Sequence, residues 1–166
     1  MKITQAAMPI PDTAVVPGPT LTPWDINPAV AEMQELLRAH DYSVPVNGDF
    51  DWKTEVAVKA YQRAHGLKVD AIVGPETWIS LKSTVQPGVR ILRAGCSGAD
   101  VYALQGLLQI QGFVIKRDGV FGAETRSAVI AFQQRQHLQA TGLVNSVTWA
   151  LLGEKKETYQ KRKWQN

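Results

Sequence analysis

The chain has 166 residues, of which 45% are hydrophobic and 20% charged, and its net charge is +3. This balance is typical of globular domains and excludes an intrinsically disordered chain. The single cysteine, Cys96, excludes an internal disulfide. No apolar run reaches the length of a membrane-spanning helix, and the N-terminus lacks the apolar stretch of a secretory signal. We therefore expect a protein that is made in the cytoplasm and has no membrane span.

Residues 1–26 are unusually rich in proline. The prolines are Pro9, Pro11, Pro17, Pro19 and Pro23. Proline at this density opposes helix formation and favours an extended chain. The sequence therefore predicts an extended arm, which acts as a tether or as a strap on a neighbouring surface. A simple flexible leader is the alternative.

Two segments of the chain, 30–81 and 101–152, repeat one another without an insertion or deletion. The copies lie 71 residues apart and share 16 of 52 positions, where unrelated segments would share roughly three. The repetition predicts two small domains, 27–82 and 95–153, joined by a linker at 83–94. The remainder, 154–166, is predicted to be a charged tail.

Each repeated unit is predicted to hold three helices, so the expected fold class is all-α. The predicted helix caps are Asn27, Asp51 and Gly74 in the first unit and Ser97, Gly122 and Asn145 in the second. Pro28 follows its cap at the position where proline suits a helix start. Gly66 is predicted to end the second helix of the first unit in a left-handed conformation. Because His137 stands at the corresponding position, we expect a different ending in the second unit.

The charge of the chain is concentrated outside the repeats. Residues 30–81 carry −3 and residues 95–153 carry +1, whereas 82–94 and 154–166 carry +3 each. Nucleic-acid-binding domains usually gather basic residues on one face of the fold. We therefore expect no nucleic-acid partner.

Motifs throughout the second unit carry a resemblance to a known family. They include Gly95-x-x-Gly98-x-Asp100-Val101, Asp118-Gly119-Val120-Phe121-Gly122, Thr141-Gly142-Leu143-Val144 and Thr148-Trp149-x-x-Leu152. With this spacing, the unit resembles the peptidoglycan-binding domain family, a three-helix repeat appended to many bacterial cell-wall hydrolases. The resemblance implies that the ligand is peptidoglycan, through its peptide stem or its glycan.

The first unit resembles the family more loosely. It keeps Asn47-Gly48-x-Phe50 and Thr77-Trp78, but has Asp51-Trp52 where the family usually has Gly-Pro. It also has Ala71 where the family commonly has glycine. Since most of the matching residues are core or turn residues, the resemblance defines the fold better than the ligand contacts.

The candidate ligand-binding residues are of three kinds: turn residues, glutamines that follow an aromatic residue, and tryptophans. The glutamines suit a hydrogen bond to a ligand or, equally, to a loop carbonyl. Tryptophan can stack on a sugar ring, although helical spacing favours a core position for two of the three. Trp52 has no aromatic counterpart in the second unit and is expected at an interface specific to this protein. The candidates are Asn47, Gln62, Trp78 and Trp52 in the first unit and Asp118, Gly119, Gln133 and Trp149 in the second.

No catalytic residues, metal site or cofactor are expected. The three histidines, His40, His65 and His137, do not recur between the two units and have no zinc-ligand spacing. Cys96 has no evident base near it in the sequence. The sequence therefore predicts a protein that is not an enzyme.

These observations lead to one main functional hypothesis and two alternatives. The main hypothesis is non-catalytic binding of peptidoglycan by two tandem modules, whose linkage would raise the effective affinity. The first alternative is a structural adaptor of a phage tail or tail-like contractile injection assembly, in which the arm and tail dock on protein partners. The second is the targeting part of a cell-wall lytic system. The expected place of action is the cell envelope or a phage-like particle.

Overall fold

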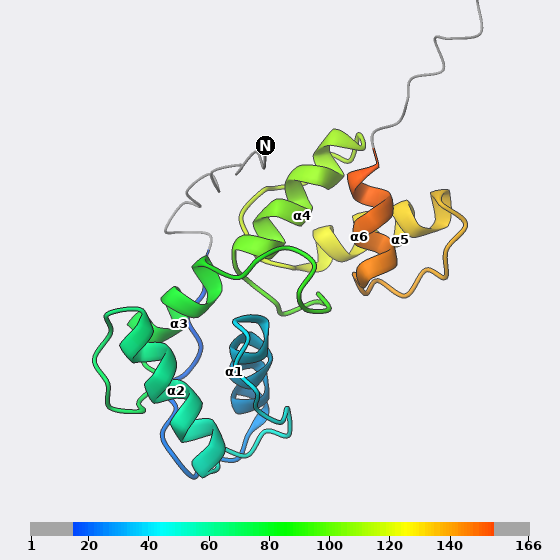
Figure 1. Ribbon diagram of the computed structural model, residues 1–166. Helices are drawn as coiled ribbons and strands as arrows, with labels where there is room; N and C mark the ends of the chain where they lie inside the picture. Colours follow the sequence, from blue (N-terminus) through cyan, green and yellow to red (C-terminus); the bar gives the residue numbers. More distant parts are fainter. Residues whose placement is uncertain (1–14, 155–166) are drawn as a thin grey trace, which may run out of the picture.

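The computed structural model describes residues 15–154, which form two groups of three helices (Figure 1). The first group contains α1 (Pro28–Ala39), α2 (Trp52–Ala64) and α3 (Pro75–Ser83). The second contains α4 (Ala99–Ile110), α5 (Ala123–Arg135) and α6 (Ser146–Gly153). Within the described residues, extended pairing is limited to isolated bridges such as Leu21–Val73 and Leu92–Val144. The predicted all-α fold with two tandem three-helix units is confirmed.

Side-chain caps begin three of the helices as predicted. The side chain of Asn27 accepts hydrogen bonds from the N–H groups of Ala29 and Val30. Asp51 and Asn145 each accept from the N–H three residues ahead. The predicted cap Ser97 was wrong, because α4 begins after Gly98 and has no side-chain cap. The Ser97 hydroxyl instead lies 3.2 Å from Lys82 Nζ at the junction of the two units.

The second helix of each unit ends in the same way. Gly66 and His137 adopt left-handed conformations with φ of 66° and 57°. The next residue then donates to the carbonyl oxygen of a buried glutamine, at 2.9 Å for Leu67 and 2.8 Å for Leu138. The expected difference at His137 was therefore wrong. Histidine is among the residues that adopt this region more readily than most side chains.

Each unit has its own hydrophobic core. The first is built around the fully buried side chains of Phe50, Tyr61 and Trp78, and the second around those of Phe121 and Phe132. Both cores also contain a leucine that precedes the first helix of its unit. These leucines are Leu21 and Leu92, which are 71 residues apart and form corresponding bridges. The structural repeat therefore begins before the segment in which the sequence repetition is evident.

Part of the expected arm, residues 15–26, lies on the first unit and completes it. Val15 and Leu21 are buried, and the indole N–H of Trp78 donates to the carbonyl oxygen of Pro19 at 2.8 Å. Gly18 lies directly against the Trp78 ring, where an added Cβ would come within 2.6 Å. We call residues 15–21 the strap. The rest of the expected arm, 1–14, and the expected tail from 155 onward lie outside the described residues.

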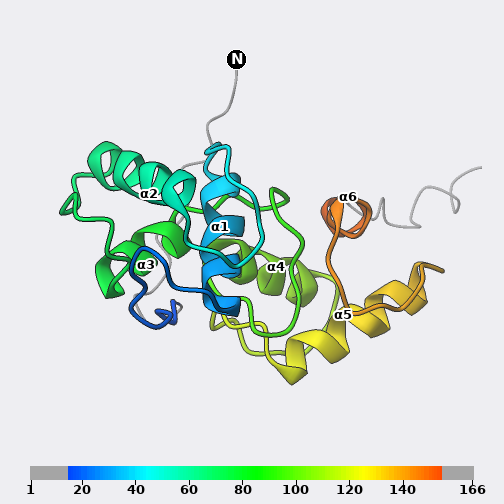
Figure 2. The same cartoon turned by 90° about the horizontal axis from the view of Figure 1, so that it is seen from below.

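The two units are joined by buried polar contacts as well as by the linker. Lys82 Nζ lies 2.9 Å from Glu32 Oε1 and 2.8 Å from Val16 O within the first unit, and 3.2 Å from Ser97 Oγ of the second. Arg93 of the linker forms an ion pair with Glu35 of α1 at 3.0 Å. Figure 2 shows the two groups beside each other, with α1 and α4 on either side of the junction.

Candidate functional site

Four buried glutamines hold four loops of the protein in the same way. Each donates from its side-chain nitrogen to a loop side chain, a loop carbonyl and a threonine at the start of the next helix. Each also accepts from a loop N–H. The glutamines and their threonines are Gln34 with Thr54, Gln62 with Thr77, Gln105 with Thr125 and Gln133 with Thr148. For Gln105 the distances are 2.9 Å to Asp118 Oδ1, 3.0 Å to Val120 O, 3.0 Å to Thr125 Oγ1 and 2.7 Å to Gly119 N.

This arrangement engages five of the eight expected ligand-binding residues in contacts within the chain. They are Asn47, Gln62, Asp118, Gly119 and Gln133. Burial raises the pKa of Asp118, but hydrogen bonds from Gln105 and from the Val120 N–H outweigh this effect, so the pKa lies below its usual value. Gln62 and Gln133 hold the loops from inside, whereas Asn47 and Asp118 are exposed residues whose side-chain oxygens bond within the loop.

Gln34 and Gln105 were not expected as site residues, although a sequence signal for them exists. A threonine follows each of them by 20 residues, and follows Gln62 and Gln133 by 15. One loop residue beside each glutamine is left-handed. These residues are Gly48, Ala71, Gly119 and Gly142, with φ of 76°, 63°, 73° and 74°. Ala71 therefore adopts the conformation that glycine supplies in the other three loops.

The tryptophans Trp78 and Trp149 occupy corresponding positions but have different surroundings. Trp78 is completely buried, and its N–H is bonded to the strap. Trp149 is partly buried against the core of the second unit. Its Nε1 is shielded from solvent and has no hydrogen-bond partner among the described residues. Such a donor is costly, because it has lost water without gaining an acceptor.

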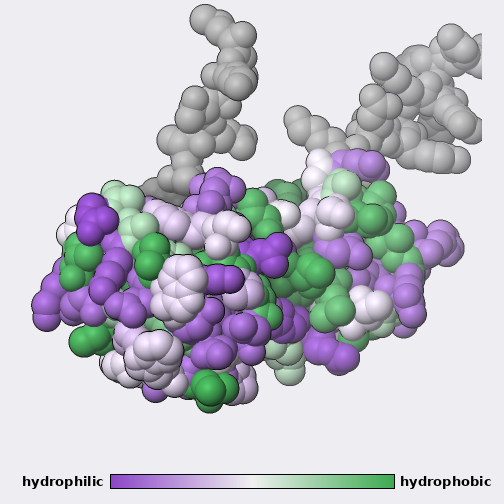
Figure 3. All heavy atoms as spheres, turned by 60° about the horizontal axis from the view of Figure 1, so that its bottom comes forward, coloured by the Kyte–Doolittle hydropathy of each residue, from purple (hydrophilic) through white to green (hydrophobic). Residues whose placement is uncertain are grey.

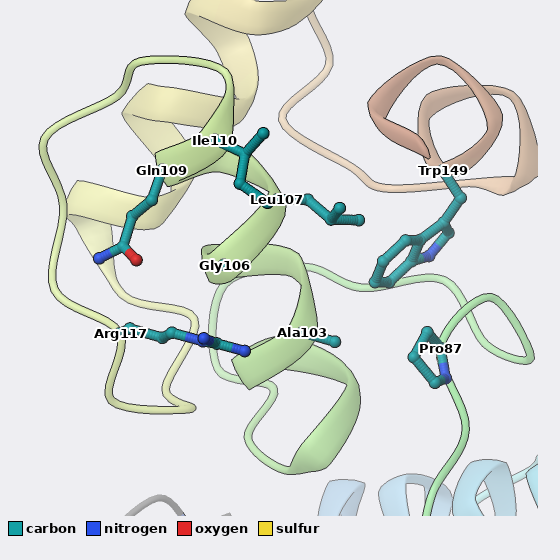
Figure 4. A pocket seen from close by; sticks show the side chains of 8 residues that line it. All are labelled: Pro87, Ala103, Gly106, Leu107, Gln109, Ile110, Arg117 and Trp149. Atoms are coloured by element: carbon teal, nitrogen blue, oxygen red, sulfur yellow. The ribbon is translucent and has the colours of Figure 1, made fainter. Parts of the chain in front are cut away.

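Trp149 lines an open hollow of about 590 Å³ between α4, α6 and the linker. In Figure 4 its ring extends toward Leu107 of α4, and Pro87 of the linker lies on the other side of the ring. Ala103, Gly106, Gln109 and Ile110 complete the α4 side. Ile110 is 80% exposed although its side chain is apolar. The hollow therefore combines an apolar surface, an indole ring and a few polar groups at its edge.

Arg117 contributes a positive charge at the edge of this hollow. Its Nε donates to the carbonyl oxygen of Tyr102 at 3.0 Å, and its guanidinium lies 4.1 Å from the Tyr102 ring centroid. Gly106 makes room for it, because a Cβ there would come within 2.8 Å of the guanidinium carbon. Within residues 15–154, Arg117 forms no ion pair with a carboxylate. The charge is thus positioned by the fold and is open to an anionic group.

The corresponding region of the first unit differs in charge and occupancy. Glu35 and Val46 stand where the second unit has Gly106 and Arg117. Glu35 pairs with Arg93, and the strap covers Trp78. The duplication therefore produced one covered tryptophan and one that borders an open hollow.

Trp52 belongs to a set of exposed apolar residues that is specific to the first unit. Trp24, Ile26, Trp52 and Val56 are 71%, 76%, 61% and 60% exposed. Their counterparts in the second unit are Gly95, Ser97, Ala123 and Ser127. The segment 24–26 lies beside 49–50, because the Trp24 N–H donates to Phe50 O at 2.9 Å and Ile26 bridges Asp49. We call these four residues the first-unit patch. On the face in Figure 3, hydrophobic and hydrophilic residues are interspersed.

Among the described residues, no group of three or more histidine, cysteine, aspartate or glutamate side chains is arranged to hold a metal ion. Cys96 is buried. None of the described helices combines the length and apolar character needed to cross a bilayer.

The fold and the doubled loop framework define a tandem pair of small three-helix domains. Comparison with known families assigns this pair: residues 27–81 and 97–152 both match the family described as "Putative peptidoglycan binding domain". The chain belongs to this family, and the predicted resemblance is confirmed.

Several known proteins share sequence with the chain. The N-acetylmuramoyl-L-alanine amidase CwlM of Mycobacterium tuberculosis is 38% identical over 105 residues, covering 60% of this chain and 26% of the relative. The amidase CwlL of Bacillus licheniformis is 30% identical over 151 residues, covering 74% of this chain and 42% of the relative. The crystal structure of the SleB N-terminal domain is 39% identical over 38% of this chain and 88% of its own, with a TM-score of 0.37. The chain thus spans less than half the length of either amidase.

Proposed function

We propose that the chain binds bacterial peptidoglycan through the hollow beside Trp149. The observation that carries this proposal is the contrast between corresponding tryptophans: one is covered by the strap, and the other borders an open hollow. The N–H of the second has no partner within the described part of the chain. Membership of a peptidoglycan-binding family supports the choice of ligand. Concave, largely apolar surfaces with a few fixed polar groups are typical of binding sites.

The proposal assigns direct binding to the second unit. The sequence left open whether both units bind, and the strap covers Trp78, the counterpart of Trp149 in the first unit. The first unit then serves as a rigid support, because Lys82 and Arg93 tie it to the start of the second unit. A single shallow site predicts weak binding to soluble fragments and stronger retention on an insoluble polymer that offers many sites.

Retention on purified cell-wall sacculi tests this proposal. Arg117→Glu reverses the charge at the edge of the hollow and should lower retention about tenfold, which corresponds to about 1.4 kcal/mol. Arg126→Glu is the matched control, because it makes the same charge change on α5 at a residue that does not line the hollow. Equal retention of both variants and the unaltered chain would exclude the hollow as the binding site.

We also propose that the chain binds the wall without cleaving it and acts at the cell envelope. Two relatives have names that identify them as amidases, and this chain spans 26% and 42% of their length. These names support a role as the targeting part of a wall-lytic system. Incubation of the isolated chain with sacculi should release no soluble fragments. Their appearance would show that the chain itself is an enzyme.

The first-unit patch supports a second candidate function, docking on a protein partner in a larger assembly such as a phage tail. Exposed apolar residues that gather at one place often mark interaction sites. Here the second unit has Gly95 and Ala123 in place of Trp24 and Trp52. The double variant Trp24→Gly/Trp52→Ala gives the first unit the residues that the second unit has at these positions. It should abolish co-purification with a high-mass particle and leave sacculus binding unchanged. Absence of any such particle with the unaltered chain would remove this candidate.

A further inference from the structure

We infer that the hollow beside Trp149 accepts a short extended peptide, whose backbone carbonyl receives the Trp149 indole N–H. This inference rests on the proposed function and specifies which part of the wall polymer is recognised. Peptidoglycan offers two chemically different components, a glycan strand and peptide stems. The arrangement of the first unit identifies the peptide.

The chain contains its own example of the interaction. At the position that corresponds to Trp149, the indole N–H of Trp78 donates to a peptide carbonyl, that of Pro19, at 2.8 Å. Gly18 then lies flat against the ring, since a Cβ there would be 2.6 Å from Cε2. An extended peptide thus satisfies this tryptophan through its backbone carbonyl and packs against the indole at a residue without a side chain.

In the second unit the same donor has no acceptor among residues 15–154. Trp149 Nε1 is buried and unpartnered, although the chain from Gln86 to Val89 corresponds in sequence to the strap residues Val15 to Gly18. Because the donor is shielded from solvent, a ligand carbonyl reaches it only if the atoms around it move aside. Val89 of this segment is 49% exposed and Pro87 lines the hollow, so the segment borders the space that a ligand would enter.

The lining of the hollow also favours a peptide over a sugar. A pyranose ring carries several hydroxyl groups, and each needs a hydrogen-bond partner when it leaves water. Only two lining residues, Gln109 and Arg117, have polar side chains away from the indole. A peptide with small apolar side chains fits the surface of Ala103 and Leu107. Arg117 complements a carboxylate on such a peptide.

The experiment follows the Trp149 indole N–H by NMR in the full chain. The probes are a synthetic tetrapeptide of wall-stem composition and a tetramer of N-acetylglucosamine. We expect the peptide to move the Trp149 indole resonance and to leave that of Trp78 in place, because the strap already satisfies Trp78. The sugar should move neither. Trp149→Phe, which assigns the resonance and removes the donor, should weaken peptide binding about tenfold.

The outcomes separate this inference from the proposed function. Movement of the Trp149 resonance by the sugar and not the peptide overturns the inference, and so does no movement by either probe while sacculi still retain the chain. In both cases the proposed function survives. If sacculi do not retain the unaltered chain, the proposed function and the inference are both overturned. The indole resonance of the unaltered chain is informative even if Trp149→Phe does not fold.

Discussion

At the scale of single residues, Trp24 is the clearest departure of the first unit from the second. It is left-handed, with a φ of 77°, where the second unit has Gly95 with a φ of 97°. A residue with a Cβ pays about 1–2 kcal/mol in this conformation. The side chain is 71% exposed, so burial does not offset that cost. Strain of this kind is commonly retained where a side chain has a function, which agrees with a docking role for the first-unit patch.

Replacement of this residue by glycine should therefore stabilise the first unit. Trp24→Gly relieves the backbone strain, while the greater freedom of the unfolded chain offsets about 0.4–1 kcal/mol. We expect a net gain of about 0.5–1 kcal/mol in the free energy of unfolding, measured by urea denaturation. Trp24→Ala is the control, since it removes the indole but keeps the strain and should give no gain. A destabilising effect of Trp24→Gly would mean that the indole makes contacts that hold the fold.

His40 predicts a pH dependence of the first unit. Its Nε2 lies 2.9 Å from the carbonyl oxygen of Leu81, so the ring links the end of α1 to α3. Burial lowers the pKa of His40 from its ordinary 6.5, and nearby positive charge acts in the same direction against the effects of Leu81 O and Asp41. The folded state therefore favours the neutral ring. This contribution to stability is present above pH 6.5 and is lost as the pH falls through 6.5 toward the lowered pKa of the folded state.

The second unit provides the variant that tests this dependence. Gln111 corresponds to His40, and its side-chain nitrogen lies 3.5 Å from the carbonyl oxygen of Leu152, the counterpart of Leu81. His40→Gln should keep the link but remove the titration. Urea midpoints of the variant should then change less than those of the unaltered chain between about pH 7 and pH 5. Parallel pH profiles would assign the dependence to other groups.

At the scale of elements, every helix start except that of α4 could be predicted from sequence, and the contact made by the strap could not. Asn27, Asp51 and Asn145 act locally, because a cap needs only the next few residues. The strap depends on a contact between Pro19 and Trp78, which are 59 residues apart. Proline predicted its extended form but not the surface on which it lies.

Prediction of the candidate site was likewise limited by contacts between residues that are far apart in the sequence. Trp78 and Trp149 occupy the same position in the two copies of the repeat. Their positions in the sequence therefore cannot tell which ring is covered and which lies beside a hollow. The difference comes from nonlocal neighbours, among them Gly106 and Arg117 in the second unit and the strap in the first. The loop glutamines were equally ambiguous, since an amide suits a ligand as well as a carbonyl. In the structure each of them donates to a loop carbonyl.

The strap itself can be tested through its glycine. Gly18→Ala would place a Cβ 2.6–2.7 Å from the Trp78 ring carbons, which requires either the ring or the strap to move. We expect a loss of about 1–3 kcal/mol in the stability of the first unit and stronger quenching of Trp78 fluorescence by acrylamide. Gly153→Ala is the control, because no atom lies within 4 Å of a Cβ added there. Unchanged stability and quenching for Gly18→Ala would mean that the strap does not cover the ring in solution.

At the scale of the whole molecule, Lys82 connects both units and the strap. Its side chain is 4% exposed, and its Nζ lies 2.8 Å from Val16 O, 2.9 Å from Glu32 Oε1 and 3.2 Å from Ser97 Oγ. The backbone also comes close here, since a Cβ on Gly98 would be 2.5 Å from the Lys82 carbonyl oxygen. A cation placed among three partners from three segments fixes their relative positions, whereas a flexible linker would leave the units free to reorient.

Lys82→Met should therefore loosen the junction while leaving both helical cores intact. Methionine fills a similar volume but leaves Glu32 without its cation, and removal of one partner from a buried pair costs about 3 kcal/mol or more. We expect a larger radius of gyration by small-angle X-ray scattering, with little change in helix content by circular dichroism. Lys59→Met is the matched control, because Lys59 pairs with Glu55 on the surface of α2 and such a pair contributes about 0.3–0.5 kcal/mol. If Lys82→Met scatters like the control, the linker and the remaining Arg93–Glu35 contact suffice to hold the two units together.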